Sequence, residues 1–368
     1  MKIALFGGSF DPFHEGHEHV LLSALKERHY NEILIIPNYQ SPHKNKSKYS
    51  LEHRLETLEK KLPNLEKKIQ QIQQNCNIKL STLECHQPSY TISTLKHLTK
   101  ANPKQSYDLL LGSDSFFSLH TWKSFNEILQ LCHLCVVKRD QKTKKEYQFY
   151  AKEVLNIETS QWHCCKNELH SASSSLLKKQ HTPFIIGICG RVGSGKSTAL
   201  NILSQALDAK AIELDHLGHD TLINHQDLFI SYFGTDILTD HKIDRKKLAS
   251  IVFNNDKQRQ LLNALSHPFI KKEALKKLDH QKTSLICGAL LFEIGLHDHC
   301  HTLINIDANS QDIIKKIGKK FTNLSKFQLS KKQFIQKCPI TLSNKFDYKF
   351  KKDLIELANQ LKILVFNK

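Results

Sequence analysis

The stretch GGSFDPFHEGH (Gly7–His17) follows the apolar run MKIALF and precedes a segment with helical spacing of apolar residues. This order predicts a strand, a glycine-containing turn and a helix, which together open a phosphate-binding βαβ unit. Gly7 and Gly8 allow the backbone to approach a phosphate because neither carries a Cβ atom. His14 and His17 lie three residues apart, so both rings can donate hydrogen bonds to one phosphate chain. The stretch therefore predicts a nucleotide-binding site.

Apolar runs alternate with helical stretches along the rest of the first half, which is typical of a parallel α/β domain. Helices are predicted over His17–Arg28 and Ser50–Lys60, the second with Ser50 as its N-cap and Glu52 in its first turn. The predicted strands are Lys2–Phe6, Glu32–Ile36, Ile78–Leu83, Tyr107–Leu111 and Leu134–Lys138. The expected fold class is α/β with doubly wound parallel sheets.

A second stretch, GRVGSGKS (Gly190–Ser197), follows the apolar run Phe184–Cys189 and fits the pattern G-x-x-x-x-G-K-[ST]. In such a P-loop the backbone amides hold the β-phosphate, Lys196 reaches the β- and γ-phosphates, and Ser197 coordinates Mg²⁺. The pattern restarts here after a polar segment that ends at Pro183. We therefore expect two domains, residues 1–181 and 184–368.

The composition is strongly basic, with 53 Lys and Arg against 36 Asp and Glu and a formal net charge of +17. Only six of these basic residues are arginines, whereas proteins that read nucleic acids usually rely on Arg for bidentate contacts. A positive field that attracts anionic nucleotide substrates explains the excess as well. We expect small-molecule substrates and no nucleic-acid partner.

The chain has no run of 18 apolar residues and begins on the strand-like MKIALF. We therefore expect no transmembrane helix, signal peptide or membrane partner, and a cytoplasmic location. The oligomeric state cannot be read from the sequence.

Ten cysteines raise the question of a metal site. Cys132 and Cys135 form one CxxC, and Cys164–Cys165 lie near His163 and His170. A structural zinc site requires four ligands, and a single CxxC inside the strand-like HLCVV is weak support for one. The pattern favours buried, reduced and inert thiols.

The first half resembles the nucleotidyltransferase superfamily, whose HxGH signature Gly7–His17 matches. Within it, the resemblance is to bacterial nicotinate-nucleotide adenylyltransferase, which joins ATP to nicotinate mononucleotide. Four later stretches carry this resemblance: Pro37–Lys44, His53–Glu59, Pro88–Leu95 and Leu111–Leu129. It covers about residues 1–180 and implies a Rossmann-like domain.

The resemblance implies that His14 and His17 bind and polarise the ATP phosphates and that Lys44 neutralises their charge. Trp122 would stack on the nicotinate ring near Thr91, although from the residues alone Trp122 could equally be a core aromatic. In the late serine-rich motif Lys178 replaces the family's Arg, so a bidentate contact becomes a point charge. The other implied ATP contacts are Gly7, Gly8, Ser9, Phe10, Gly112, Asp114, Arg139 and Ser174.

The second half, about residues 184–368, resembles dephospho-coenzyme A kinase. The stretches that carry the resemblance are Glu213–Asp215, Phe233–Leu238, Ile243–Phe253, Leu261–Ile270 and Leu290–Leu296. It implies that Asp215 receives the proton of the ribose 3′-hydroxyl, and the carboxyl end of a strand is a suitable place for such a base. The implied ATP contacts are Gly190, Gly193, Ser194, Gly195, Lys196, Ser197, Thr198 and Lys320.

The lid of this second domain departs from the family. Between Lys315 and Lys352 the chain has twelve lysines and no arginine, where the family places lid arginines, and Lys320 aligns best with one of them. The family's terminal Ala-Asp-x-Val-Ile-x-Asn is matched to Phe346–Phe350, with Lys352 at the asparagine position. If this lid is catalytic, its lysines supply charge without the two-point contact of a guanidinium and should stabilise the transferring phosphoryl group less firmly. The alternative is that the lysines only solvate a surface helical hairpin and another group serves the phosphate.

Three hypotheses follow. The first is a bifunctional enzyme that uses ATP with Mg²⁺ to make nicotinate adenine dinucleotide and coenzyme A. The second changes the first acceptor to phosphopantetheine, which would make the chain a coenzyme A synthase; Pro37–Lys44, Pro88–Leu95 and Trp122 argue against it. The third treats one half as an inactive regulatory or nucleic-acid-binding module, which the intact catalytic residues His14, His17, Lys196 and Asp215 oppose.

Overall fold

The structure is a computed structural model that describes residues 1–40, 47, 49–85, 90–165, 183–253, 255–279, 281–318, 321, 325–326 and 328–366. The chain divides into two compact units, Met1–Ser174 and Ser175–Lys368. The domain boundary expected between residues 181 and 184 falls beside residues outside this description, and it stays a prediction.

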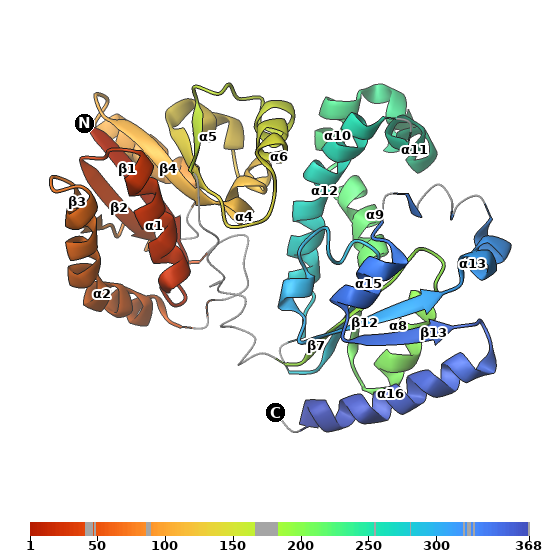
Figure 1. Cartoon of the computed structure of the whole chain (residues 1–368). Helices are drawn as coiled ribbons and strands as arrows, with labels where there is room; N and C mark the ends of the chain where they lie inside the picture. The colour runs from red at the N-terminus through yellow and green to blue at the C-terminus, as the bar shows by residue number, and fades with distance from the viewer. Residues whose placement is uncertain are drawn as a thin grey trace. The chain divides into compact units, whose positions relative to one another are not determined.

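The first unit is built on a six-stranded sheet in which every neighbouring pair is parallel (Figure 1). Its strand order is β3 (Asn77–Leu80), β2 (Glu32–Pro37), β1 (Lys2–Gly8), β4 (Ser106–Gly112), β5 (His133–Val137) and β6 (Trp162–Cys165). The order reverses direction between β1 and β4, and ligands of open α/β sheets bind at such a switch point. The parallel α/β prediction is confirmed.

Helices connect these strands: α1 (Glu15–Glu27), α2 (Leu51–Ile72), α3 (Thr91–Ala101), α4 (Ser113–Phe116), η1 (Leu119–Thr121), α5 (Phe125–Leu131), α6 (Lys144–Phe149) and η2 (Tyr150–Val154). Helix α1 turns Val20, Leu21, Ala24 and Leu25 into the core against the strands. Burial of these apolar side chains holds α1 on the sheet.

The predicted elements of this unit differ from the observed ones mainly at their ends. Helix α1 begins at Glu15 and not at His17, because His14 caps it. Ser50 caps α2 by accepting from the His53 amide at 3.2 Å, as predicted, but the helix continues past Lys60 to Ile72. Strand β3 ends at Leu80 instead of Leu83, because as an edge strand it pairs only with β2, up to Ile35.

The second unit is built on a five-stranded parallel sheet with the order β13 (Ile340–Asn344), β12 (Thr302–Ala308), β7 (Ile185–Cys189), β11 (Ser284–Cys287) and β8 (Lys210–Glu213). One core cluster joins the sheet to α8 (Lys196–Ala206) and α16 (Tyr348–Phe366). Another joins it to α9 (Leu214–Asn224), α12 (Asp256–Lys276) and α15 (Lys331–Lys337). Helices on both faces make the sheet doubly wound, as predicted.

The other elements described in this unit are α10 (Gln226–Phe233), η3 (Thr235–Ile237), the antiparallel pair β9 (Leu238–Thr239) and β10 (Lys242–Ile243), α11 (Arg245–Phe253), η4 (His297–His299) and α13 (Ser310–Ile317).

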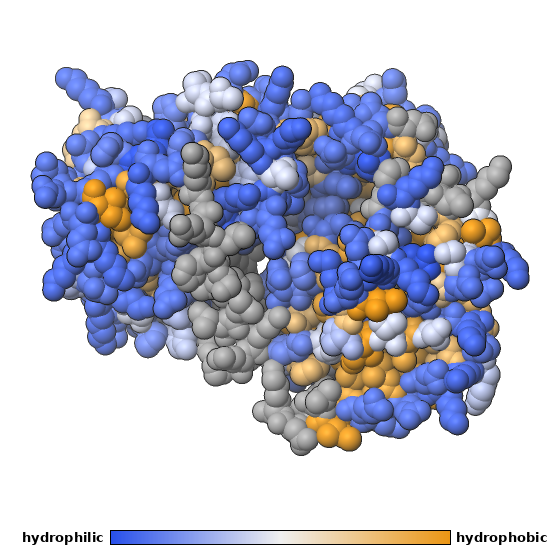
Figure 2. Space-filling model, viewed as in Figure 1, coloured by the Kyte–Doolittle hydropathy of each residue, from blue (hydrophilic) through white to orange (hydrophobic). Residues whose placement is uncertain are grey.

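Hydrophilic side chains cover most of the face shown in Figure 2, and apolar atoms gather over part of the second unit. Among the described residues, none of the helices is both long and apolar enough to span a bilayer.

A buried carboxylate stabilises the first unit. Asp108 on β4 is 0% exposed, and its Oδ2 lies 3.2 Å from Lys2 Nζ, 2.9 Å from Arg28 Nε and 2.9 Å from the Tyr30 hydroxyl that donates to it. Through these contacts Asp108 links β4 to β1 and to the end of α1. Breaking a buried ion pair on one side leaves its partners without compensation, which is costly.

Asp108→Asn should therefore lower the free energy of unfolding of the first unit by about 3 kcal/mol. Urea denaturation of the whole chain, followed by hydrogen exchange in peptides from β1 and β4, measures this. Glu127→Gln is the control, because it removes the exposed Lys96–Glu127 pair, and surface pairs contribute little. Equal midpoints for the two variants would contradict the assignment.

Candidate active sites

The carboxyl edge of the first sheet gathers most of the expected ATP contacts. Gly7 and Gly8 end β1, and Gly112 ends the adjacent strand β4. Asp114 follows at once in α4, where it is exposed. Helix α1 begins at the same edge. The residues predicted from separate motifs thus lie at the switch point of the sheet.

His14 and His17 are held by reciprocal capping hydrogen bonds at the start of α1. The Gly16 amide donates to His14 Nδ1 at 3.0 Å, and the His14 amide donates to His17 Nδ1 at 3.3 Å. A ring nitrogen that accepts carries no proton, so in each neutral ring these bonds assign the proton to Nε2. The ring centroids lie 3.9 Å apart. Each neutral ring therefore carries its N–H donor at Nε2, and a phosphate oxygen can accept a hydrogen bond from such a donor.

Aromatic packing fixes the ring of His17. Phe13 stacks on it with centroids 5.4 Å apart, and Phe10 meets it edge-on at 5.1 Å. Phe10 has a positive φ of 45° and is 1% exposed. A Cβ at Gly8 would lie 2.9 Å from the Phe10 ring. Glycine at this position is thus required by the packing of Phe10, and this adds to the expected need for close phosphate approach.

Arg54 stabilises the Gly7–His17 loop and was not among the predicted site residues. Its side chain is 1% exposed, and its guanidinium donates to the carbonyls of Ser9, of Asn38 at 2.9 Å and of Tyr39 at 3.0 Å. Burial lowers the pKa of the Arg54 guanidinium below its usual value, although the nearby Asp11 opposes this shift. The fork thereby joins the Gly7–His17 loop to the segment after β2.

Arg139 lies over Gly112, as the expected phosphate and adenosine contacts require. A Cβ at Gly112 would come within 3.1 Å of the Arg139 side chain. The Arg139 amide donates to Ser113 Oγ at 2.7 Å, and Tyr147 donates to the same oxygen at 2.6 Å. Burial raises the pKa of Tyr147, so the phenol stays protonated and keeps donating. The loop after β5 is thus tied to the end of β4.

The two residues expected at the nicotinate ring come from neighbouring segments. Thr91 begins α3, and Trp122 is half-buried at the end of η1. Their chain neighbours meet, because Lys123 Nζ lies 4.4 Å from the centre of the Tyr90 ring. Lys44 and Ser174 lie outside the described residues, and their expected roles stay predictions.

The P-loop of the second unit requires its glycines. Gly190, Gly193 and Gly195 have φ values of 140°, 76° and 100°, in the region that side chains disfavour. A Cβ at Gly190 would lie 2.3 Å from the Ile306 carbonyl, and one at Gly195 would lie 2.2 Å from Asn344 Nδ2. Conformation and space together exclude larger residues.

Lys196, Ser197 and Thr198 open α8 directly after these glycines. Lys196 Nζ donates to the Arg191 carbonyl at 2.9 Å. Burial lowers the pKa of Lys196, and the nearby Cys287 and Asp215 raise it. Asp215 is exposed in the first turn of α9, after β8. The predicted base thus acts electrostatically on the P-loop lysine.

The asparagine of this region that contacts the P-loop corrects an expectation. The sequence match placed Lys352 at the family's asparagine position, but Lys352 lies inside α16. Asn344, at the end of β13, donates from Nδ2 to the Ser194 carbonyl at 2.8 Å. Its amide occupies the space that a side chain at Gly195 would need. Lys320 lies outside the described residues.

Arg191, to which no role was assigned from sequence, ties the P-loop to the end of β12 and the start of α13. Its guanidinium donates to Ser310 Oγ at 2.8 Å and to the Ala308 carbonyl at 2.6 Å. It also lies 5.4 Å from the centre of the Phe321 ring. The base of the expected lid is therefore joined to the loop by an arginine.

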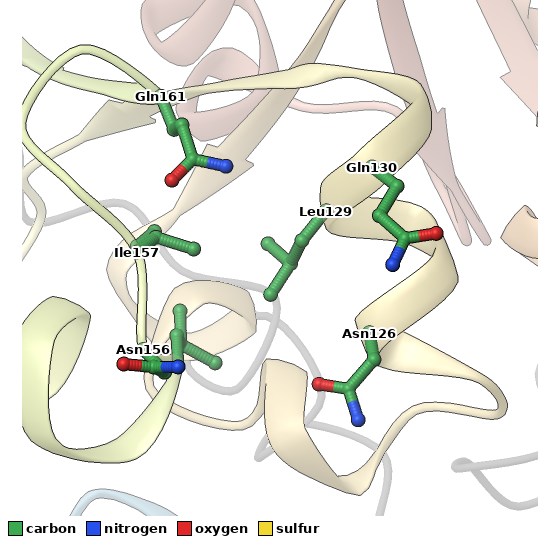
Figure 3. Close-up of a pocket in the computed structure, with 7 residues that line it drawn as sticks. Asn126, Leu129, Gln130, Asn156, Ile157 and Gln161 are labelled. Atoms are coloured by element: carbon green, nitrogen blue, oxygen red, sulfur yellow. The ribbon is translucent and has the colours of Figure 1, made fainter.

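A separate hollow of about 460 Å³ lies in the first unit between α5 and the segment before β6 (Figure 3). Leu129 and Ile157 point toward each other across it. Its lining consists of Asn126, Leu129, Gln130, Leu155, Asn156, Ile157 and Gln161. None of these side chains is ionisable, so this hollow cannot supply acid–base chemistry or phosphate-binding charge, and it is not the active site.

Comparisons with known proteins divide at the same place as the motifs. A family model described as cytidylyltransferase-like matches residues 5–180, and one described as dephospho-CoA kinase matches residues 184–337. A probable nicotinate-nucleotide adenylyltransferase of Aquifex aeolicus is 38% identical over 159 residues, which are 42% of this chain and 89% of that relative. The dephospho-CoA kinase of Borreliella burgdorferi is 33% identical over 178 residues, 48% of this chain and 82% of that relative.

A probable nicotinate-nucleotide adenylyltransferase of Shewanella frigidimarina is 33% identical over 38% of this chain. The chain covers 62% of that relative's length, which is less than two thirds. The Aquifex and Borreliella relatives, by contrast, are covered over most of their length. The chain belongs to two families, the bacterial nicotinate-nucleotide adenylyltransferases over its first half and the dephospho-CoA kinases over its second.

Proposed function

We propose that the chain catalyses two ATP-dependent reactions at separate sites. The first unit transfers the adenylyl group of ATP to nicotinate mononucleotide, giving nicotinate adenine dinucleotide and pyrophosphate. The second unit phosphorylates the ribose 3′-hydroxyl of dephospho-CoA, giving CoA and ADP. The observation that carries this proposal is a pair of helix starts suited to phosphate. Helix α1 begins with His14 and His17, and α8 begins with Lys196. Each helix follows the first strand of its own parallel sheet along the chain.

In the first reaction a phosphate oxygen of nicotinate mononucleotide attacks the α-phosphorus of ATP. The bond from that phosphorus to the bridging oxygen breaks, and pyrophosphate leaves with the bonding electrons. His14 and His17 donate from Nε2 to oxygens whose negative charge grows during this step. Arg139, beside Gly112, adds a fixed positive charge. The residues position and neutralise, and no covalent enzyme intermediate is needed.

In the second reaction Asp215 accepts the proton of the 3′-hydroxyl, whose oxygen attacks the γ-phosphorus of ATP. The bond between this phosphorus and the β–γ bridging oxygen breaks, and ADP leaves. Lys196 follows the three positive-φ glycines of the P-loop and compensates charge on the β- and γ-phosphates. In the structure its Nζ donates to a loop carbonyl, and an ammonium group with three N–H donors can keep this bond while it contacts phosphate oxygens.

Mg²⁺ fits the second site, because the exposed Ser197 side chain in the first turn of α8 offers the hard oxygen ligand that this ion prefers. Bound with ATP, the ion would supply charge neutralisation across the phosphates. Ser197 would hold it, and Lys196 would remain the charge contributed by the chain.

The acceptor of the first site is proposed to be nicotinate mononucleotide. The support is the stacking position expected for Trp122 beside Thr91 and the similarity of the first unit to probable nicotinate-nucleotide adenylyltransferases. Phosphopantetheine has no flat ring to stack on an indole. A chain that used it would make CoA in two consecutive steps, and the acceptor assay below separates the two alternatives.

The two activities should be separable. His14→Ala removes one phosphate donor of the first site and should lower kcat of adenylyl transfer roughly 100-fold, with kinase activity unchanged. Lys196→Ala should abolish kinase activity and leave adenylyl transfer unchanged. Release of pyrophosphate and of ADP, assayed separately on the full chain, measures both. One substitution that silences both activities in a folded protein would contradict independent sites.

Gly195→Ala should raise the kinase KM for ATP roughly ten-fold or more, a cost of about 1.4 kcal/mol, because the new Cβ meets Asn344 and distorts the P-loop. Gly234→Ala is the matched control: φ there is 78°, and a Cβ would meet no atom within 4 Å. It should cost about 1–2 kcal/mol of stability and leave KM unchanged. A KM for ATP in Gly195→Ala equal to that of the control would show that the space beside Asn344 does not control ATP binding.

Nicotinate mononucleotide should exceed phosphopantetheine in kcat/KM by roughly 100-fold or more. Trp122→Ala should raise KM for nicotinate mononucleotide about ten-fold through loss of stacking, and Trp122→Phe should restore most of it. Comparable kcat/KM values for the two acceptors would favour the coenzyme A synthase alternative.

A further inference from the structure

Three metal-ligating side chains meet in the first unit, away from the residues assigned to ATP. Glu27 is the last residue of α1, and His163 and Cys165 lie two apart on β6, which places both on one face of the strand. Glu27 Oε2 lies 3.0 Å from His163 Nε2. The carboxylate, imidazole and thiol ligand atoms all lie within 4.8 Å of one another.

A second thiol adjoins this group. Cys135 on β5 is the register partner of His163, and its Sγ lies 3.5 Å from Cys165 Sγ. Cys132, the other half of the CxxC, instead donates from Sγ to the Ile128 carbonyl at 3.3 Å. The CxxC spacing does not mark this group, because spacing along the chain does not show that β5 and β6 are neighbours. The ligand atoms that lie close together belong to Glu27, His163 and Cys165, and Cys135 adjoins them through Cys165.

The separations suit a tetrahedral ion. Zinc bonds of about 2.0–2.3 Å at tetrahedral angles place ligand atoms roughly 3.3–3.8 Å apart. The Glu27–His163 separation of 3.0 Å is close to this range. The other separations in the group do not exceed 4.8 Å, so none needs to close by more than about 1 Å. Glu27 and His163 have side chains 26% and 35% exposed, so they have room to adjust and leave a path for the ion.

The donor types suit a transition-metal ion. Zinc is bound by the thiolate form of cysteine, so binding at Cys165 should release a proton. Carboxylate, imidazole and thiolate are also the O, N and S donors that zinc accepts together, whereas Mg²⁺ and Ca²⁺ prefer oxygen alone.

We propose that Glu27, His163 and Cys165 bind one Zn²⁺, with Cys135 beside the site as a neighbour of Cys165. The ion joins the carboxyl end of α1 to β6, a four-residue strand that pairs with β5 at the edge of the described sheet. Because the site is independent of ATP, it adds to the proposed function without depending on it. Its role is to fasten the last strand of the first sheet.

Zinc binding by the full chain tests this proposal. The protein is stripped with a chelator and titrated with ZnCl₂ against a chromophoric competitor, and bound zinc is counted by elemental mass spectrometry. The wild type should hold one equivalent and release protons on binding. His163→Ala, Glu27→Gln and Cys165→Ser should each weaken affinity at least about ten-fold, since even changes outside the ligand shell often cost that much. Matched controls are His133→Ala, an exposed histidine on β5, and Cys164→Ser, the other thiol of β6.

Cobalt substitution provides a second readout, since a thiolate ligand gives a charge-transfer band that a solvent-exposed carboxylate site lacks. The band should disappear in Cys165→Ser and remain in Cys164→Ser. If Cys165→Ser fails to fold, the half-exposed His163→Ala decides the question by its zinc affinity. Failure of the wild type to retain zinc against the competitor would overturn the proposal. Wild-type affinity in both His163→Ala and Glu27→Gln would overturn it equally.

Discussion

Each nucleotide site depends on a helix that begins at the carboxyl edge of a parallel sheet. The first amides of a helix have no partner within it, and they face the direction from which an anion arrives. In α1 the ring of His14 takes one of these donors, the Gly16 amide, so the capping group is itself a phosphate-binding candidate. In α8 the N-cap is Gly195, which makes no side-chain cap, so its first amides are left for phosphate. The same constraint thus leads to two chemically different solutions.

Both solutions need support from residues that are distant in sequence. The loop before α1 is held by the buried guanidinium of Arg54, which reaches three carbonyls. The loop before α8 is held by the carboxamide of Asn344 on one side and by the guanidinium of Arg191 on the other. Loops that must expose amides to a ligand cannot satisfy themselves internally, so side chains from elsewhere carry part of their hydrogen bonding. This makes the supporting residues part of each site although they need not touch substrate.

Local sequence patterns were sufficient to predict the two strand–turn–helix segments, because in each segment the glycines and the apolar run lie within a few residues of each other. Most of the strands that were predicted agree with the observed ones to within a residue or two for the same reason, whereas β6, β8, β11, β12 and β13 were not predicted. The supports were not predicted: Arg54 reads as one more basic residue of an amphipathic helix, and Asn344 was missed because the lysine-rich C-terminal segment drew the match to Lys352. The meeting of Cys135 with Cys165 depends on β5 and β6 being neighbours, which no spacing along the chain encodes. Contacts between elements decide these features.

The distribution of arginine follows from the same geometry. The chain has only six arginines among 53 basic residues, and four of them occupy sites where a planar fork is useful. Arg54 and Arg191 each donate to more than one oxygen, Arg28 pairs with the buried Asp108, and Arg139 lies over Gly112. A lysine could supply the charge in any of these places but not two or three directed bonds from one rigid group. A lysine is sufficient where a hydrated point charge serves, whereas Arg54 and Arg191 hold several oxygens in fixed positions from one rigid group.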